Sequence, residues 1–104
     1  MYRATTPTLT YNLSGALPSD FEEMEITLSQ DGEVLVTKTL EDCTVEESTL
    51  QIELTQEEAN RFKKGVASTQ IRAITPEGRV HASYECEFYV SDVLDDDIME
   101  VPDE

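Results

Sequence analysis

Residues 22–40 read EEMEITLSQDGEVLVTKTL, and this stretch decides the fold. From Met24 to Leu28 every second side chain is apolar and the intervening ones are polar, which is typical of a half-buried strand. Asp31-Gly32 then predicts a type I′ turn, because Gly tolerates the positive φ that this turn needs. The stretch therefore predicts a hairpin of strands 22–30 and 33–40, the second with Val34 and Val36 on one face and Leu35 on the other.

The same alternation recurs elsewhere in the chain. It predicts strands over 6–13, 49–54, 66–75 and 79–90, and a short edge strand around Thr44 and Val45. Turn residues separate these segments at roughly 8–12-residue intervals, a spacing typical of a β-sandwich. In the strand 79–90 one face is predicted to hold Val80, Ala82, Tyr84, Cys86, Phe88 and Val90.

The period changes at Thr55-Gln56-Glu57-Glu58, which has the form of a helix capping box. We expect a helix over 56–64, with Lys63 and Lys64 at its C-terminal end and Gly65 as a left-handed cap. The fold class is therefore all-β: an antiparallel immunoglobulin-like β-sandwich of six to seven strands, with one short helix before the penultimate strand. A small barrel is the alternative. The expected core contains Leu9, Tyr11, Ile26, Leu28, Ile52, Leu54, Phe62, Tyr84 and Phe88.

Length and charge limit the possible functions. The chain has 104 residues, the size of one domain, and its net charge is 7 − 23 = −16. Nucleic acids and anionic membranes need a basic surface, so neither is an expected partner. No apolar run is long enough to span a bilayer, and the first residues lack the apolar region of a signal peptide.

The end of the chain differs in composition from the rest. Residues 91–104 hold seven acids and no base. We divide the chain into a sandwich domain, 1–94, and an acidic C-terminal tail, 95–104. Like charges favour a solvated tail. The tail region also contains apolar residues that could dock on the sandwich or on a neighbouring subunit: Val93, Leu94, Ile98 and Met99.

No group of residues has the form of an active site. The acids Asp95, Asp96, Asp97 and Glu100 could hold Ca²⁺, but they lack the ligand spacing of a calcium loop. His81 has no second ligand near it, and Ser83 and Ser91 have no oxyanion hole. Gly32, Gly65 and Gly78 are single glycines in turns and do not form a phosphate-binding loop. We predict no catalytic, cofactor-binding or metal residues, no cofactor, and a protein that is not an enzyme.

The two cysteines, Cys43 and Cys86, are expected to be thiols. Cys86 should behave as a small hydrophobe on its strand face, and the acids beside Cys43 should disfavour its thiolate. Some apolar side chains are expected on the strand faces that point away from the core: Leu35, Ile71 or Ile74, and Tyr89. They would either pack against another copy or be covered by the helix or the tail.

Several segments together resemble a known group of proteins: 2–8 (YRATTPT), 54–65 (LTQEEANRFKKG), 70–72 (QIR), 76–78 (PEG), 82–83 (AS) and 92–94 (DVL). These resemble small β-sandwich proteins encoded among prophage morphogenesis genes of Gram-positive bacteria. They are similar, more loosely, to the N-terminal sandwich domain of phage baseplate proteins, which share an L-T-x-E corner followed by a glycine.

The resemblance implies a non-enzymatic phage or prophage structural or accessory protein. It would act through protein–protein contacts in a virion assembly, in the tail, baseplate or head, with other phage structural proteins or itself as partners. The expected location is the virion or the bacterial cytoplasm. The alternative is an acidic binding module, such as a DNA-mimicking inhibitor of a basic protein. A mimic should line one face with carboxylates, whereas a structural module should scatter its acids and leave an apolar face uncovered.

Overall fold

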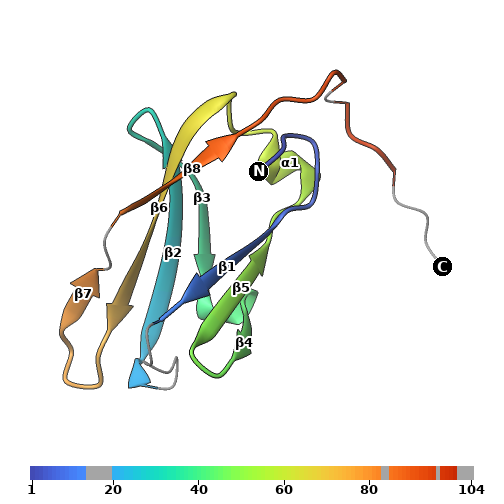
Figure 1. The fold of residues 1–104 in the computed structure, drawn as a ribbon. Coiled ribbons are helices and arrows are strands. Elements are labelled where there is room, and N and C mark those ends of the chain that lie inside the picture. The colour runs from blue at the N-terminus through green and yellow to red at the C-terminus, as the bar shows by residue number, and fades with distance from the viewer. Residues whose placement is uncertain (14–19, 83–84, 96, 101–104) are drawn as a thin grey trace.

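The computed structural model describes residues 1–13, 20–82, 85–95 and 97–100. In these ranges, eight strands form two antiparallel sheets that pack face to face (Figure 1). The elements are β1 (Thr8–Asn12), β2 (Glu23–Gln30), β3 (Glu33–Thr39), the 3-10 helix η2 (Leu40–Asp42), β4 (Thr44–Glu46), β5 (Thr49–Glu53), α1 (Gln56–Ala59), β6 (Gly65–Ile74), β7 (Val80–Ala82) and β8 (Cys86–Val90).

The strand order is that of an immunoglobulin-like sandwich. One sheet has the order β1-β5-β4, which corresponds to strands B, E and D of that fold. The other has the order β3-β2-β6-β7, and β8 also pairs with β6, so β2, β6 and β8 take the places of strands C, F and G. Near the N-terminus Tyr2 forms a parallel bridge with Ser91, beside the end of β8. The predicted fold class is confirmed, with eight described strands instead of six to seven. Three strands follow α1 instead of two, because the predicted last strand is divided.

The helix lies where the chain crosses from one sheet to the other, and it is shorter than predicted. Its capping box is present: the Glu58 N–H donates to Thr55 Oγ1 at 3.1 Å, and Thr55 N–H donates to Glu58 Oε1 at 2.9 Å. The prediction of a helix over 56–64 is wrong, because α1 ends at Ala59 and the Lys63 N–H bonds to the Gln30 side chain instead. Lys63 and Lys64 thus follow a turn, and Gly65 begins β6 with φ of 135°.

The central hairpin has the predicted turn and an unpredicted bulge. Asp31 and Gly32 both have positive φ, 54° and 79°. Leu28 pairs with Val36 but Ser29 pairs with Val34, so one extra residue stands in β3. Val36 is therefore buried while Val34 is 59% exposed on the outer face, which corrects the prediction that the two valines share a face.

The predicted last strand, 79–90, is divided into β7 and β8. Thr69 and Arg72 of β6 are three positions apart, whereas their partners Cys86 and Ala82 are four apart. Because of this one-residue shift, even-numbered residues point to the outer face in β7 and to the inner face in β8. The prediction that Val80 and Ala82 share a face with Phe88 is wrong, since they lie on the outer face. His81, opposite the buried Ala73, lies on the inner one.

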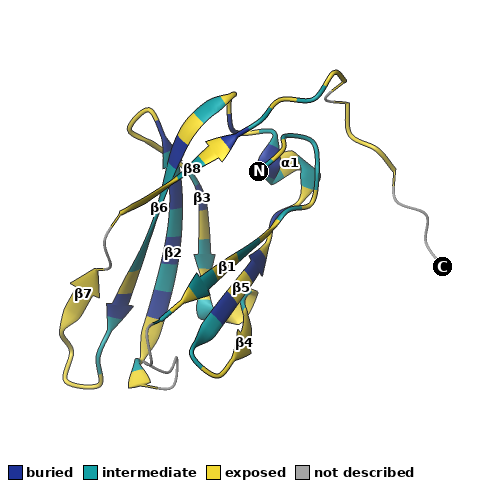
Figure 2. Ribbon diagram, viewed as in Figure 1, coloured by how far each residue is buried: buried dark blue, intermediate teal, exposed yellow. Residues whose placement is uncertain are grey.

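The core lies between the sheets, and its buried residues alternate along β2 and β5 (Figure 2). Of the predicted core, Leu9, Tyr11 and Phe88 are only partly buried but pack against the buried cluster. Tyr84 lies outside the described residues. The edge of the second sheet at β7 is exposed throughout. The buried apolar residues are Met24, Ile26, Leu28, Val36, Leu50, Ile52, Leu54, Ala59, Phe62, Ala67, Ala73 and Val90.

Candidate functional site

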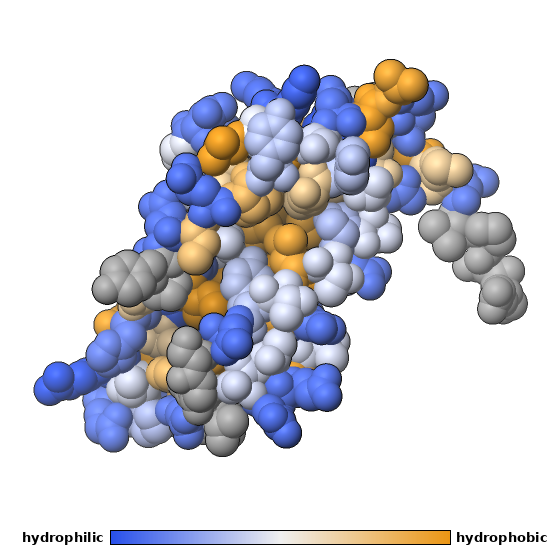
Figure 3. Space-filling model, in the orientation of Figure 1, coloured by the Kyte–Doolittle hydropathy of each residue, from blue (hydrophilic) through white to orange (hydrophobic). Residues whose placement is uncertain are grey.

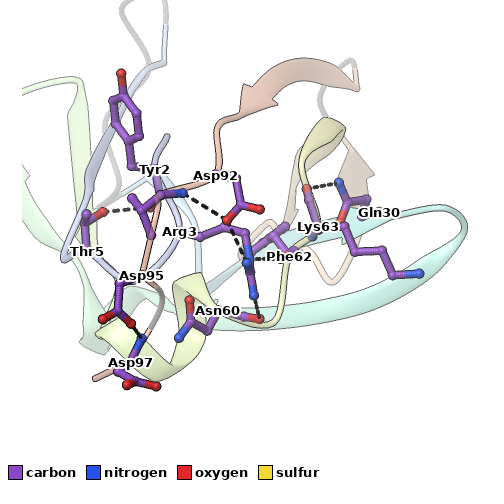
Figure 4. A network of polar contacts seen from close by, with 11 residues as sticks. Tyr2, Arg3, Thr5, Gln30, Asn60, Phe62, Lys63, Asp92, Asp95 and Asp97 are labelled. Atoms are coloured by element: carbon purple, nitrogen blue, oxygen red, sulfur yellow. Dashed lines mark hydrogen bonds and ion pairs between the residues drawn. The ribbon is translucent and has the colours of Figure 1, made fainter. Parts of the chain in front are cut away.

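A polar network joins the N-terminal residues and the segment just after β8 to the corner after α1 (Figure 4). Arg3 Nε donates to the Phe62 carbonyl oxygen at 2.7 Å, and its Nη1 contacts Asp92 Oδ1 at 2.8 Å. The hydrogen bond from Arg3 is the main reason why the pKa of Asp92 is lowered. The Tyr2 ring points away from this network. The network fixes the corner but presents no reactive group.

An open groove of about 640 Å³ lies at the opposite end of the sandwich, where β2 begins and β6 ends. Met24, Leu40 and Ile74 supply apolar walls. Four glutamates line it as well, and one of them, Glu25, pairs with Arg72 Nη2. The distance from Glu25 Oε1 to that nitrogen is 2.6 Å. The groove therefore combines apolar contact with negative charge, and the glutamates are Glu22, Glu23, Glu25 and Glu41.

The outer face of the second sheet carries uncovered apolar side chains. Val66 and Tyr89 are directly opposite each other on β6 and β8, and they are 54% and 53% exposed. Tyr2, which pairs with Ser91 two residues beyond Tyr89, is also exposed. Of the apolar set expected to lie off the core, Leu35 and Ile71 pack against it, whereas Tyr89 is exposed. Ile74 lines the groove.

The described polar residues that were considered for chemistry lie on separate elements. His81 is exposed at the β7 edge, Ser91 takes part in the bridge to Tyr2, and Ser83 lies outside the described residues. Gly32, Gly65 and Gly78 occupy separate turns with positive φ. Within the described ranges, no three His, Cys, Asp or Glu side chains converge in a way that could hold a metal ion.

Both cysteines lie in the described part of the chain and neither forms a disulfide. Cys43 is half-buried; burial, and next the charge of Asp42, raise the pKa of its thiol. Cys86 is exposed, although its strand position faces the other sheet, so the prediction that it packs as a small hydrophobe is wrong. Between the sheets, burial raises the pKa of Tyr11, whose hydroxyl is 2.8 Å from Thr69 Oγ1.

The described part of the tail region is hydrogen-bonded to α1. The Gln56 side chain binds the main chain of Met99 in both directions: Nε2 donates to the Met99 carbonyl and Oε1 accepts from its N–H, each at 2.8 Å. The Asp97 N–H donates to Asp95 Oδ1, so those two acids order their own turn. Asp96 lies outside the described residues. Leu94 and the Met99 side chain are exposed.

No family model matches the sequence, and no curated protein matches it significantly. Among solved structures, the chain is similar in fold to CopC from Methylosinus trichosporium OB3b. The TM-score is 0.55 over 88% of this chain and 82% of that one, with 14% sequence identity. At this identity the likeness supports the sandwich fold alone. The described residues contain no helix that is long and apolar enough to cross a membrane.

Proposed function

We propose that this chain is a non-enzymatic structural or accessory protein of a phage or prophage. It acts through protein–protein contacts in a virion assembly, in the tail, baseplate or head. The proposal starts from the resemblance of the corner 54–65 and its neighbouring segments to prophage morphogenesis proteins. It places the protein in the virion, or in the bacterial cytoplasm before assembly.

The uncovered apolar pair on the second sheet supports this proposal most directly. Val66 and Tyr89 are each more than half exposed, although cross-strand aromatic and β-branched pairs usually contribute to packing. An aromatic side chain that stays exposed on a rigid sheet is suited to a protein interface, where Tyr is enriched.

The distribution of acids favours this proposal over a DNA mimic. A mimic should present its carboxylates on one face. Here described acids lie on the outer faces of both sheets, on α1 and in the tail region. Negative charge on all sides instead keeps copies apart until a specific contact forms. Examples from the two sheets are Glu25 and Glu87 on one and Glu46 and Glu53 on the other.

The test is genetic and uses a lysogen that carries the gene. Deletion should lower the yield of intact particles after induction, and the wild-type gene should restore it. A Val66→Ser/Tyr89→Ser double variant should restore it poorly. Val80→Ser, a matched change at an exposed valine beside the groove, should restore it fully. Unchanged particle yield and morphology after deletion would contradict the proposal.

A further inference from the structure

Among the described residues, no strand pairs with the outer side of β1. Within the described chain, β1 pairs only with β5. In an immunoglobulin sandwich strand A lies beside strand B, which is the position next to β1. Here residues near the N-terminus lie beside the end of β8 instead, through the bridge between Tyr2 and Ser91. We call the position beside β1 the A slot.

The main chain of β1 directs hydrogen-bonding groups into the A slot. The Pro7 carbonyl accepts from Leu54 N–H at 3.0 Å, and Leu13 N–H donates to the Ser48 carbonyl at 2.8 Å. In an antiparallel pair, hydrogen-bonded positions alternate with positions whose groups point away. Odd-numbered residues of this strand therefore bond to β5. The N–H and C=O groups of Thr8 and Thr10 point toward the A slot.

The A slot also has an apolar floor. Tyr11 Oη lies 2.8 Å from Thr69 Oγ1, which places β1 above β6, so a strand added beside β1 would lie above β8. Cys86 and Phe88 are on the inner face of β8, opposite Thr69 and Ala67. Cys86 is nevertheless exposed and Phe88 only partly buried. Figure 3 shows hydrophobic side chains between the two sheets on this side of the molecule.

The other sheet edges are protected against pairing, and β1 is not. The edge strand β3 has a bulge and carries charges at Glu33 and Lys38, and β4 is three residues long. The β7–β8 edge has the register shift. By contrast, β1 pairs in straight register, and residues 4–19 contain no charged residue in a chain that is 29% charged. An edge strand left neutral in so charged a chain is suited to main-chain pairing.

We propose that the A slot accepts an extended strand from a partner protein, which completes the first sheet by β-strand addition. Every second side chain of this strand is aliphatic and packs over Cys86 and Phe88. The strand carries net positive charge, because the chain that it joins carries −16. A second copy of this chain does not fit edge to edge at the A slot, because β8 already occupies the space that the other sheet of that copy would need. The inference rests on the proposed function in that it names a second protein contact, separate from the one at Val66 and Tyr89.

The test uses two synthetic peptides, KVTVKVTVK and KKVVTKTVV, which have the same composition and charge. Only the first alternates as a strand requires. It should bind the full chain about tenfold or more tightly than the second, with amide shifts in NMR spectra at Thr8 and Thr10. In a Cys43→Ser background, it should also slow alkylation of Cys86. Equal binding of both peptides, or shifts confined to the glutamate groove, would overturn the inference.

Variants of β1 test the main-chain contact. Thr10→Pro removes an N–H that points into the A slot, and proline is tolerated on an edge strand at such a position. It should weaken binding of the alternating peptide about tenfold, whereas Thr10→Val, which keeps the N–H, should not. If Thr10→Pro does not fold, Cys86→Arg, at an exposed position on the floor, should give the same loss. Undiminished binding by a folded variant overturns the inference.

The two proposals fail separately. If the peptide experiments fail but gene deletion still lowers particle yield, strand addition is wrong and the phage role stands. If strand addition is observed but deletion has no effect on particles, the phage role is wrong and the A slot serves another partner.

Discussion

The side chain of Gln30 and the main chain of Lys63 bind each other in both directions. Gln30 Nε2 donates to the Lys63 carbonyl and Gln30 Oε1 accepts from the Lys63 N–H, each at 2.7 Å. Gln30 is 7% exposed at the end of β2, and the amide matches the hydrogen-bonding pattern of a strand neighbour. This contact joins the hairpin of the second sheet to the corner after α1.

Gln30→Leu should lower the free energy of unfolding by about 1–3 kcal/mol, because the Lys63 N–H and C=O are then left without their partner. Urea unfolding measures this difference. Gln56→Leu, which removes a similar two-way contact whose hydrogen bonds are exposed, serves as the control and should cost less. Equal effects would show that burial of the Gln30 contact does not matter.

Thr55→Ala should cost about 1 kcal/mol, since it removes the acceptor for the Glu58 N–H at the start of α1. Because the cap is a local hydrogen bond, most of the loss should persist at high salt. Thr55→Ser keeps the hydroxyl and should restore most of the stability. An unchanged urea midpoint for Thr55→Ala would mean that α1 does not contribute to global stability.

The sequence was sufficient for the strands and for the corner. Alternation placed β2 and β5, and the capping box placed the start of α1. It was not sufficient for the two register shifts, because one extra residue in Val34-Leu35-Val36 changes the faces without changing the residue types. The predicted hydrophobic role of Cys86 depended on what covers β8, which its own alternation does not reveal.

Long-range polar contacts left no local signal. Gln30 binds Lys63, 33 positions away, and Arg3 binds Asp92, 89 positions away. In the sequence a glutamine beside a hairpin turn looks like any polar turn residue. The A slot left one signal that could have been used: the uncharged stretch 4–19, which stands out in so acidic a chain.

The ion pair between Lys38 and Glu58 should make stability depend on pH. Nζ lies 2.9 Å from Glu58 Oε2, and both side chains are 16% exposed. Burial alone would raise the pKa of Glu58, but hydrogen bonds from Lys38 and Thr55 outweigh it, so the pKa lies below its usual value of 4.5. A lowered pKa means that the stabilisation is present above pH 4.5 and is lost as the pH falls through the folded-state value.

Glu58→Gln should therefore cost about 1–2 kcal/mol near neutral pH, with a glutamine that can still close the capping box. The difference from wild type should shrink below pH 4.5. Urea unfolding at a series of pH values measures it, with Glu57→Gln, an exposed neighbour, as the control. A difference that does not change with pH would contradict the role of the ion pair.

Added salt should raise the melting temperature. Seven bases can neutralise at most seven of the 23 acids, so repulsion disfavours the compact state. Screening over about 8–10 Å near physiological ionic strength relieves this repulsion. Calorimetry at low and moderate concentrations of sodium chloride measures the change in melting temperature. A melting temperature that falls with salt would show that the ion pairs stabilise the fold more than the excess charge destabilises it.

Removal of residues 95–104 should leave a folded sandwich. In the described part of this segment, the main chain of Met99 hydrogen-bonds to the Gln56 side chain. Two exposed hydrogen bonds should contribute about 1 kcal/mol or less. The truncation also removes six acids, which takes the net charge to −16 + 6 = −10, so the shortened protein should self-associate more readily.

A double-mutant cycle separates the Gln56 contact from the charge effect. Gln56→Ala and the truncation should each lower the melting temperature slightly, and the two together should lower it no more than the truncation alone, because both remove the same contact. Light scattering reports self-association of each form. A fall of more than about 10 °C on truncation would mean that the tail completes the core, since that shift corresponds to roughly 2 kcal/mol in a domain of this size.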